Sequence, residues 1–229
     1  MQALESKLRA GLLALELALS DAQIASLLDY QGLIQKWNKV YNLTAVRDPD
    51  DMLTHHLLDS LAVIAPLRRQ LAQQSKAMGE GVSGGNALRL LDVGSGAGLP
   101  GVVIAICCPD VHVDCVDTVG KKAAFIQQAA VTLKLRNLHG VHARVENLTE
   151  KYQVICSRAF ASLADFIDWS RQALAAQGVW LAMKGKHPED ELSVLPPDTE
   201  VFHVEQLIVP GLDAERCLIW MKPGVRSIN

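Results

Sequence analysis

The residues best suited to chemistry form a glycine-rich loop between an apolar strand and a helix. The stretch Leu91–Gly101 reads Leu-Asp-Val-Gly-Ser-Gly-Ala-Gly-Leu-Pro-Gly. Glycines at such a turn let the backbone approach a ligand without interference from Cβ atoms, and the following helix offers unpaired N–H groups. Asp117 closes the next expected strand, where a carboxylate can accept hydrogen bonds from ribose hydroxyls. These residues predict a site for a nucleotide-type cofactor.

Two cofactors fit the loop, and its acidic residue favours one of them. Gly96, Gly98 and Gly101 match the G-x-G-x-x-G pattern of dinucleotide sites, whereas Asp92, Gly94, Gly96 and Gly98 match the loop of S-adenosylmethionine (SAM) methyltransferases. A carboxylate two residues before the first glycine repels a pyrophosphate but suits a ligand with an ammonium and a sulfonium. SAM is therefore the favoured cofactor, with NAD as the alternative and a purely structural turn as the third reading.

A second set of polar residues follows later strands. Arg158 comes directly after the expected strand 153–157, and Lys184 directly after 178–183. Active sites of open α/β sheets gather at such carboxyl ends, so both are candidate catalytic residues. Arginine at this place can donate to guanine O6, a phosphate or a cofactor carboxylate, and a surface salt bridge is the alternative. Cys156 is interpreted as a buried strand cysteine.

The adjacent histidines do not predict a metal site. Neighbouring residues of a helix point in different directions, so His55 and His56 do not easily ligate one ion. His56 and Asp59 share a face at a spacing of three but supply only two ligands. We expect no metal and interpret the histidines as packing or RNA-facing residues.

The elements that must position these residues alternate between strand and helix after Leu88. This alternation predicts a Rossmann-like α/β fold with a mostly parallel seven-stranded sheet and a closing antiparallel hairpin. Helices are expected over 98–107, 121–135, 162–175 and 188–195. The expected strands cover 88–93, 111–117, 139–142, 153–157, 178–183, 201–209 and 216–221.

The chain before this sheet is predicted to be a helical extension over residues 1–71. Ser20 with Gln23 forms a capping-box pattern for a second helix that ends near Asn38, and Asp48–Pro49 begins a third. Residues 72–87 are rich in glycine and predict a flexible linker, which leaves 88–229 as the SAM-binding methyltransferase domain. The leucines that recur at helical spacing near the N-terminus predict packing against that domain; they are Leu4, Leu8, Leu12, Leu15 and Leu19.

Composition excludes some function classes. The 229 residues include 22 basic and 25 acidic side chains, a net charge of −3 that argues against a wholly basic nucleic-acid coating protein. Residues 121–186 nevertheless carry 10 basic and 4 acidic side chains, which predicts a local basic face. The five cysteines are an odd number in apolar runs, typical of reduced thiols in a cytoplasmic protein. No apolar run approaches the roughly 20 residues of a membrane span.

Several motifs together resemble the bacterial RsmG (GidB) methyltransferase family. The resemblance covers nearly the whole chain in order, and it implies SAM-dependent methylation of N7 of one guanine in the 530 loop of 16S ribosomal RNA. The motifs are Trp37–Asp48, His56–Ser60, Asp92–Gly101, Asp117–Lys122, Arg144–Glu146, Ser157–Ser162 and Lys184–Gly185.

The resemblance also implies roles for individual residues. Gly94 and Leu99 would be cofactor contacts in the loop, and Val145 and Glu146 would contact the adenine side. Arg158 would be a further contact with cofactor or substrate. The linker is longer than the resemblance leads us to expect, which leaves open how the two parts of the chain are arranged.

The expected chemistry agrees with what the sequence lacks. Guanine N7 has a free lone pair and no proton to lose, so an in-line displacement needs positioning but no general base. The sequence has neither an Asp-Pro-Pro-Tyr motif for amino-group methylation nor a Pro-Cys pair for cytosine C5. An NAD-linked oxidoreductase is one rival, although no Tyr-x-x-x-Lys pair occurs, and a non-catalytic RNA-binding assembly factor is another. The expected partner is 16S rRNA or the small ribosomal subunit, bound by a monomer.

Overall fold

The computed structural model describes residues 2–77 and 88–224, and its centre is one seven-stranded sheet. The strand order is β3-β2-β1-β4-β5-β7-β6. β1 to β5 pair in parallel, whereas β7 is antiparallel to both β5 and β6. The predicted parallel sheet with a closing hairpin is thereby confirmed. The strands are β1 (Leu88–Val93), β2 (Val111–Asp117), β3 (Leu138–His142), β4 (Tyr152–Arg158), β5 (Leu174–Lys184), β6 (Thr199–Leu207) and β7 (Arg216–Pro223).

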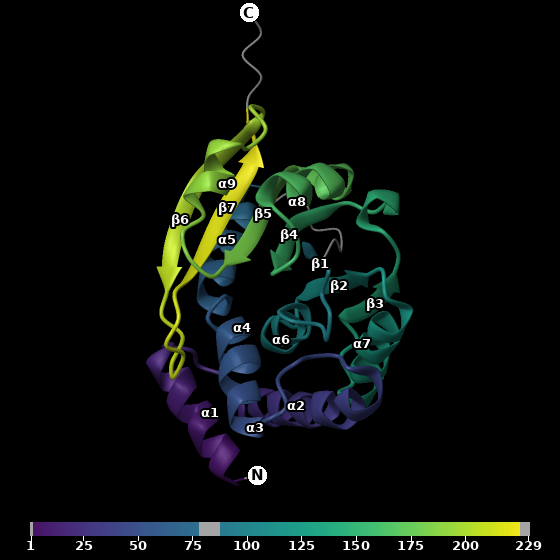
Figure 1. The fold of residues 1–229 in the computed structure, drawn as a ribbon, viewed down its shortest axis with the longest axis vertical. Helices are drawn as coiled ribbons and strands as arrows, with labels where there is room; N and C mark the ends of the chain where they lie inside the picture. Colours follow the sequence, from purple (N-terminus) through teal and green to yellow (C-terminus); the bar gives the residue numbers. More distant parts are fainter. Residues whose placement is uncertain (1, 78–87, 225–229) are drawn as a thin grey trace, which may run out of the picture.

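Helices cover both faces of this sheet, as buried parallel strands require. Figure 1 shows α2, α6 and α7 on one side of the sheet and α8 on the other. The helices are α1 (Gln2–Ala14), α2 (Asp21–Tyr41), α3 (Pro49–Met52), the π-helical turn η1 (Leu53–Leu58), α4 (Asp59–Leu61), α5 (Ile64–Ala77), α6 (Gly101–Cys107), α7 (Gly120–Thr132), the 3₁₀ turn η2 (Val145–Asn147), α8 (Leu163–Ser170), the 3₁₀ turn η3 (Arg171–Ala173) and α9 (Glu189–Ser193).

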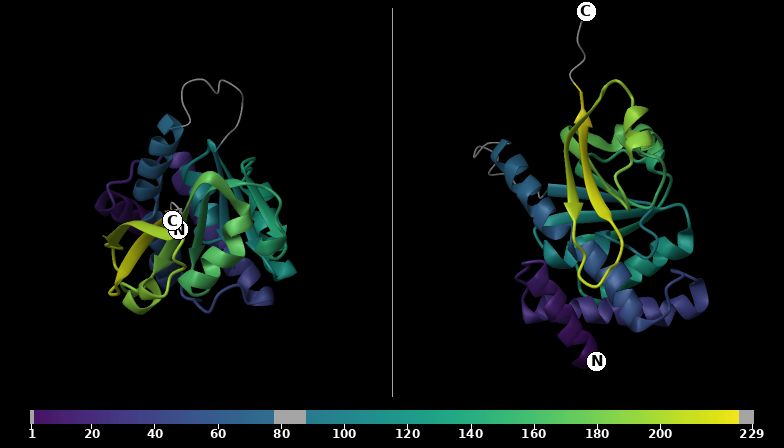
Figure 2. Two further views of the ribbon diagram at one scale, coloured as in Figure 1. Left: turned by 90° about the horizontal axis from the view of Figure 1, so that it is seen from above. Right: turned by 60° about the vertical axis from the view of Figure 1, so that its left-hand side comes forward.

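The N-terminal helices share one hydrophobic core with the sheet. Leu8 of α1 and Leu27 of α2 belong to the same buried cluster as Val102 of α6 and Leu181 of β5. All five leucines expected to pack there do contact this cluster. On the far edge, α5 runs beside the β6–β7 hairpin (Figure 2), where Arg69 forms an ion pair of 2.7 Å with Glu205. The helical extension therefore supports the sheet directly.

Several boundaries differ from those expected, including three in the N-terminal region. α1 stops at Ala14 because Glu16 adopts a left-handed φ of 53°, so Leu15 and Leu19 pack from outside the helix. α2 continues past Asn38 to Tyr41, where Asn42 provides a left-handed cap. α5 continues to Ala77, so the expected linker is wrong over 72–77, and the remainder, 78–87, lies outside the described residues.

Tyr30 connects the helical extension to the glycine loop. Its side chain is fully buried, and its hydroxyl donates to the carbonyls of Ala97 (2.6 Å) and Gly98 (3.2 Å). Replacing Tyr30 with phenylalanine leaves both buried carbonyls without this donor at almost unchanged volume. We expect Y30F to lower the free energy of unfolding by about 1–3 kcal/mol. Because the loop is then less restrained, we also expect a several-fold weaker SAM affinity, measured by calorimetry; an unchanged affinity would show that the loop does not depend on α2.

Candidate functional site

The glycine loop leaves β1 at the point where the strand order reverses, which is where ligands bind in open α/β sheets. Gly94, Gly96 and Gly98 have φ values of +65°, +60° and +88°, which side chains rarely adopt. A Cβ at Gly96 would meet no atom within 4 Å, so open space lies against this backbone. The expected helix begins only at Gly101 because residues 94–99 are used by this turn. The loop is thus shaped for a ligand that approaches the main chain.

Asp117 ends β2 and holds this loop from the side. Its carboxylate accepts hydrogen bonds from the backbone N–H groups of Gly96 (3.0 Å) and Val119 (2.8 Å), and Lys122 lies 3.7 Å away. The residue is only 6% exposed, yet it lines a cavity. A buried carboxylate with lone pairs left over suits the hydroxyl pair of a ribose.

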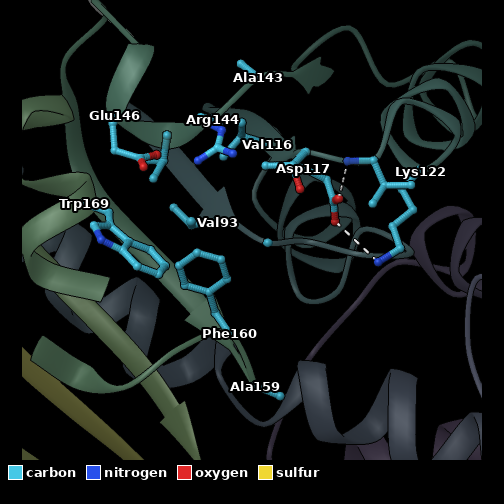
Figure 3. Close-up of a pocket in the computed structure, with 14 residues that line it drawn as sticks. Val93, Val116, Asp117, Lys122, Ala143, Arg144, Glu146, Ala159, Phe160 and Trp169 are labelled. Carbon is cyan, nitrogen blue, oxygen red and sulfur yellow. Dashed lines mark hydrogen bonds and ion pairs between the residues drawn. The ribbon is translucent and has the colours of Figure 1, made fainter. Parts of the chain in front are cut away.

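This first cavity has a volume of about 470 Å³, within the range of small-molecule sites. Figure 3 shows the carboxylates of Asp117 and Glu146 on two sides of it, and the rings of Phe160 and Trp169 next to each other below Glu146. The rings meet edge to face with their centroids 5.8 Å apart. The lining also includes Val93, Gly94, Val116, Thr118, Val119, Lys122, Ala143, Arg144, Val145 and Ala159.

These residues fit SAM. The cavity offers Asp117 for the ribose, and Val145 and Glu146 beside apolar surface for the adenine. The open backbone at Gly96 can receive the rest of the molecule. Phe160 packs against the Cα of Gly94, where an added Cβ would come within 2.3 Å of the ring. Only glycine therefore fits at this position beside the ring.

Asp92 does not line this cavity, so its expected contact with the cofactor stays a prediction. The side chain is fully buried, and Oδ2 accepts a hydrogen bond of 2.8 Å from the N–H of Gly101. Gly101 is packed so closely that an added Cβ would lie 2.3 Å from the Cys115 sulfur and 2.8 Å from Asp92 itself. The hydrogen bond of Asp92 thus links the start of α6 to β1. Burial of this carboxyl raises its pKa to about 7, an effect that the charge argument from the sequence could not include.

This raised pKa predicts a pH-dependent stability. In the unfolded chain Asp92 loses its proton near pH 4, whereas the folded chain retains it up to about pH 7. Unfolding therefore releases a proton between these values, and the free energy of unfolding contributed by Asp92 decreases as the pH rises through this window.

Asp92→Asn removes this titration but keeps an acceptor for Gly101. From pH 5 to pH 8 we expect D92N to gain stability relative to the parent by on the order of 3 kcal/mol. Urea unfolding at the two pH values measures the difference. A difference between the proteins that does not change with pH would contradict the assignment.

A second cavity of about 410 Å³ adjoins the first, and Ala159 lines both. Its lining consists of His55, His56, Asp59, Arg158, Ala159, Met183, Lys184, Gly185 and Arg216. Asp59 is buried and binds two arginines, with Oδ2 at 2.8 Å from Arg158 Nη1 and Oδ1 at 2.8 Å from Arg216 Nε. Arg158 also donates to the carbonyl of His55 at 3.2 Å. Three segments far apart in the chain therefore meet in one ion-pair network.

Lys184 and His56 are held by other partners. Lys184 Nζ contacts both oxygens of Glu191, at 2.9 and 2.8 Å, and donates to the carbonyl of Ala161. Burial lowers the pKa of His56, whose Nε2 lies 2.7 Å from the hydroxyl of Thr44. Its Nδ1 has no hydrogen-bond partner among the described residues. The second cavity thus has three cationic side chains in its lining, those of Arg158, Lys184 and Arg216.

The structure thus separates the predicted site residues into three groups. Gly94, Asp117, Val145 and Glu146 line the first cavity, and Arg158 and Lys184 line the second. Asp92, Gly96, Gly98 and Leu99 line neither, and their direct contact with the cofactor stays a prediction. Cys156 is buried as expected, and burial raises its pKa well above that of a free thiol.

Sequence reasoning missed three groups in the two cavities. The sequence predicts Arg216 only as part of a strand, Asp59 only as a possible metal ligand and Phe160 only as a member of its motif. The sequence does contain a signal for Arg216, because this charged residue stands at the start of an apolar strand. That start lies near the carboxyl end of β5. No local pattern pairs it with Asp59, which is 157 residues earlier.

One group of potential metal ligands occurs elsewhere in the described residues. Side-chain ligand atoms of His112, Asp114 and His139 lie within 4.8 Å of one another near the starts of β2 and β3. Asp114 is already bound by Arg89 and by the Tyr152 hydroxyl, each at 2.8 Å. The expected absence of a metal stays a prediction.

Comparison with known proteins decides the family. The model of the family described as rRNA small subunit methyltransferase G matches residues 23–219. The chain belongs to this family. The protein named ribosomal RNA small subunit methyltransferase G from Acidovorax sp. (strain JS42) is 67% identical over 219 residues, 96% of this chain and 95% of the relative. That of Albidiferax ferrireducens is 66% identical over 222 residues, 97% and 98% of the two chains.

The family membership confirms the resemblance found in the sequence, and with it the Rossmann-like fold, the SAM cofactor and the activity of an rRNA methyltransferase. A solved structure described as "Conversion of a Disulfide Bond into a Thioacetal Group during Echinomycin Biosynthesis" has a TM-score of 0.50 and 11% identity, and covers 69% of this chain and 82% of that chain. At this identity it shows the fold alone. None of the helices in the described residues has the length and apolar character to cross a membrane.

Proposed function

We propose that the chain methylates N7 of a single guanine in the 530 loop of 16S ribosomal RNA. The first cavity holds SAM and the second receives the guanine. The observation that carries this proposal is the contact between the two cavities at Ala159, which places a donor-lined space beside the cofactor space. When bound, SAM supplies a methyl group on a cationic sulfonium, and that methyl passes to the N7 lone pair as its bond to sulfur breaks.

The residues of the chain supply orientation more than proton transfer. N7 carries no proton, so no general base is needed, and positioning accounts for the acceleration. Asp117 fixes the ribose of the cofactor, while Val145 and Glu146 border its adenine. Arg158 and Lys184 lie at the ends of β4 and β5 and direct N–H groups toward the base or its phosphate. The donors of the second cavity suit the acceptor atoms on the N7 edge of guanine.

The small ribosomal subunit is the proposed partner, bound by a monomer in the cytoplasm. The basic segment 121–186 supports an RNA contact, but its surface charge is smaller than the count of side chains suggests. Lys122, Arg158, Arg171 and Lys184 are each paired with a carboxylate. A limited basic surface agrees with an enzyme that must leave its RNA after one modification.

The test is incubation of the purified protein with labelled SAM and small subunits that lack the modification, followed by mapping of the labelled base. Label at one guanine N7 of the 530 loop is the expected result. Label only at other positions would refute the assigned nucleotide. An absence of transfer together with tight RNA binding would favour the non-catalytic assembly factor, and NAD binding without SAM binding would favour the oxidoreductase.

A further inference from the structure

Asp59 belongs to the motif His56–Ser60, to which the proposed function assigns no task. It is 3% exposed, although a carboxylate is rarely buried unless it is paired. Its two oxygens are bound by two different arginines, one from the end of β4 and one from the start of β7. Neither oxygen is directed at a backbone group, so the carboxylate does not serve as a helix cap. Its contacts point to a role in orienting the two guanidinium groups.

Asp59 binds both arginines but leaves each of them with further N–H donors. Arg158 and Arg216 have side chains 18% and 23% exposed, and both line the second cavity. Each guanidinium carries five N–H donors in a rigid plane. Asp59 takes one N–H of each and thereby sets the plane in which the others lie. It also neutralises one of the two charges, which limits repulsion between the guanidinium groups in a half-buried space.

The first motif of the N-terminal region supports the same cavity. Asn38 accepts a hydrogen bond of 3.0 Å from the N–H of Thr44, whose hydroxyl lies 2.7 Å from His56 Nε2. The π-helical turn η1 then leads from His56 directly to Asp59. The first motif therefore supports His56 from behind, and His56 and Asp59 of the second motif line the cavity. β4, β5 and β7 contribute the rest of its lining.

The donors of this cavity suit the N7 edge of guanine better than that of adenine. On the N7 edge, guanine presents two acceptors, N7 and O6, whereas adenine presents the N7 acceptor beside an amino donor. Both oxygens of Asp59 are occupied, as is the carboxylate of Glu191 next to Lys184. An adenine amino group would therefore face cationic donors.

We propose that Asp59 is a positioning residue that aims Arg158 and Arg216 at O6 of the target guanine, so that O6 is read while the N7 lone pair stays free for the methyl group. This inference rests on the proposed function. It adds that O6 is the group by which guanine is distinguished from adenine, and that Asp59 is the residue that sets this discrimination.

The test compares bases as well as variants. Small subunits are reconstituted with RNA that carries guanine, 2-aminopurine or hypoxanthine at the target position. 2-Aminopurine keeps N7 and the 2-amino group but lacks O6, whereas hypoxanthine keeps N7 and O6 but lacks the amino group. For the parent protein we expect kcat/KM to fall by about 10- to 100-fold on 2-aminopurine and by less than about 3-fold on hypoxanthine.

Asp59→Asn keeps the shape of the side chain but turns an amino group toward one arginine. We expect D59N to lower kcat/KM on guanine and to reduce the discrimination between guanine and 2-aminopurine to a few-fold. The SAM dissociation constant should stay within about 3-fold, because Asp59 does not line the first cavity. Glu191→Gln is the matched control, since it removes a carboxylate partner of a cation in the same cavity and should leave the discrimination intact.

The outcomes separate the alternatives. If D59N lowers kcat/KM by the same factor on guanine and on 2-aminopurine, the discrimination between these bases is unchanged. Asp59 would then have only a structural role, which overturns the proposal. A parent protein that does not distinguish the two bases overturns it as well. If D59N does not fold, Arg216→Lys is the second variant, because it removes the Nε donor that Asp59 binds. Undiminished discrimination between guanine and 2-aminopurine in that variant also overturns the proposal. Failure of the parent to methylate guanine N7 while it binds SAM would instead refute the proposed function.

Discussion

Replacing Asp117 with alanine should weaken SAM binding by roughly 100-fold. The carboxylate ends β2 inside the first cavity, and hydrogen bonds to a charged acceptor contribute about 1.5–3 kcal/mol each. Two bonds from ribose hydroxyls, partly offset by water in the variant, correspond to about two powers of ten in the dissociation constant. The same substitution also frees the N–H groups of Gly96 and Val119, which loosens the loop. Calorimetric titration with SAM measures the effect.

The protein should remain folded in this variant. Val119 lines the cavity and open space lies against Gly96, so water can replace the carboxylate at both released N–H groups. Asp110→Ala is the matched control, because Asp110 is an exposed aspartate just before β2 that lines neither cavity. An unchanged dissociation constant for D117A, with the melting temperature preserved, would remove Asp117 from the cofactor site.

Replacing Arg158 with alanine should lower kcat/KM for the small subunit by 100-fold or more, at about 1.4 kcal/mol for each factor of ten. Arg158 is the last residue of β4 and lines the second cavity, one residue before the alanine that borders both. Loss of its donors removes contacts to the base at the place where the methyl group must arrive. The SAM dissociation constant should change by less than about 3-fold, because Arg158 lies outside the first cavity. Single-turnover methylation assays with saturating SAM measure the effect.

A disturbed fold is the main alternative explanation for a lower kcat/KM in R158A. In R158A, Asp59 keeps Arg216 at 2.8 Å, so the buried carboxylate is not left without a partner. Arg171→Ala is the matched control, since Arg171 pairs with Asp198 away from both cavities and should keep full activity. Full activity in R158A would remove this arginine from the site. A loss of SAM affinity equal to the loss of turnover would move it to the cofactor.

The amino-acid sequence by itself determined the order of the elements and the location of the cofactor loop. The reason is that these signals are local. Apolar strands separated by helices define the parallel sheet, and in such a sheet the residue that ends a strand must lie at its ligand-binding edge. Asp117, Arg158 and Lys184 could be placed by this rule alone. Glycine is also the residue type that most readily adopts left-handed φ values, so the glycines of the loop predict its tight turn.

Only the tertiary structure decided which polar groups face a cavity and which are buried behind it. Asp92 is the last but one residue of β1, and Asp117 is the last residue of the neighbouring strand β2. Asp92 is enclosed by α6, with a raised pKa, while Asp117 opens on the first cavity. Asp59 and Arg216 meet across 157 residues because the N-terminal helices share a core with the sheet and bring the start of α4 against β7. Contacts of this kind arise from packing between distant segments, and no spacing within the chain encodes them.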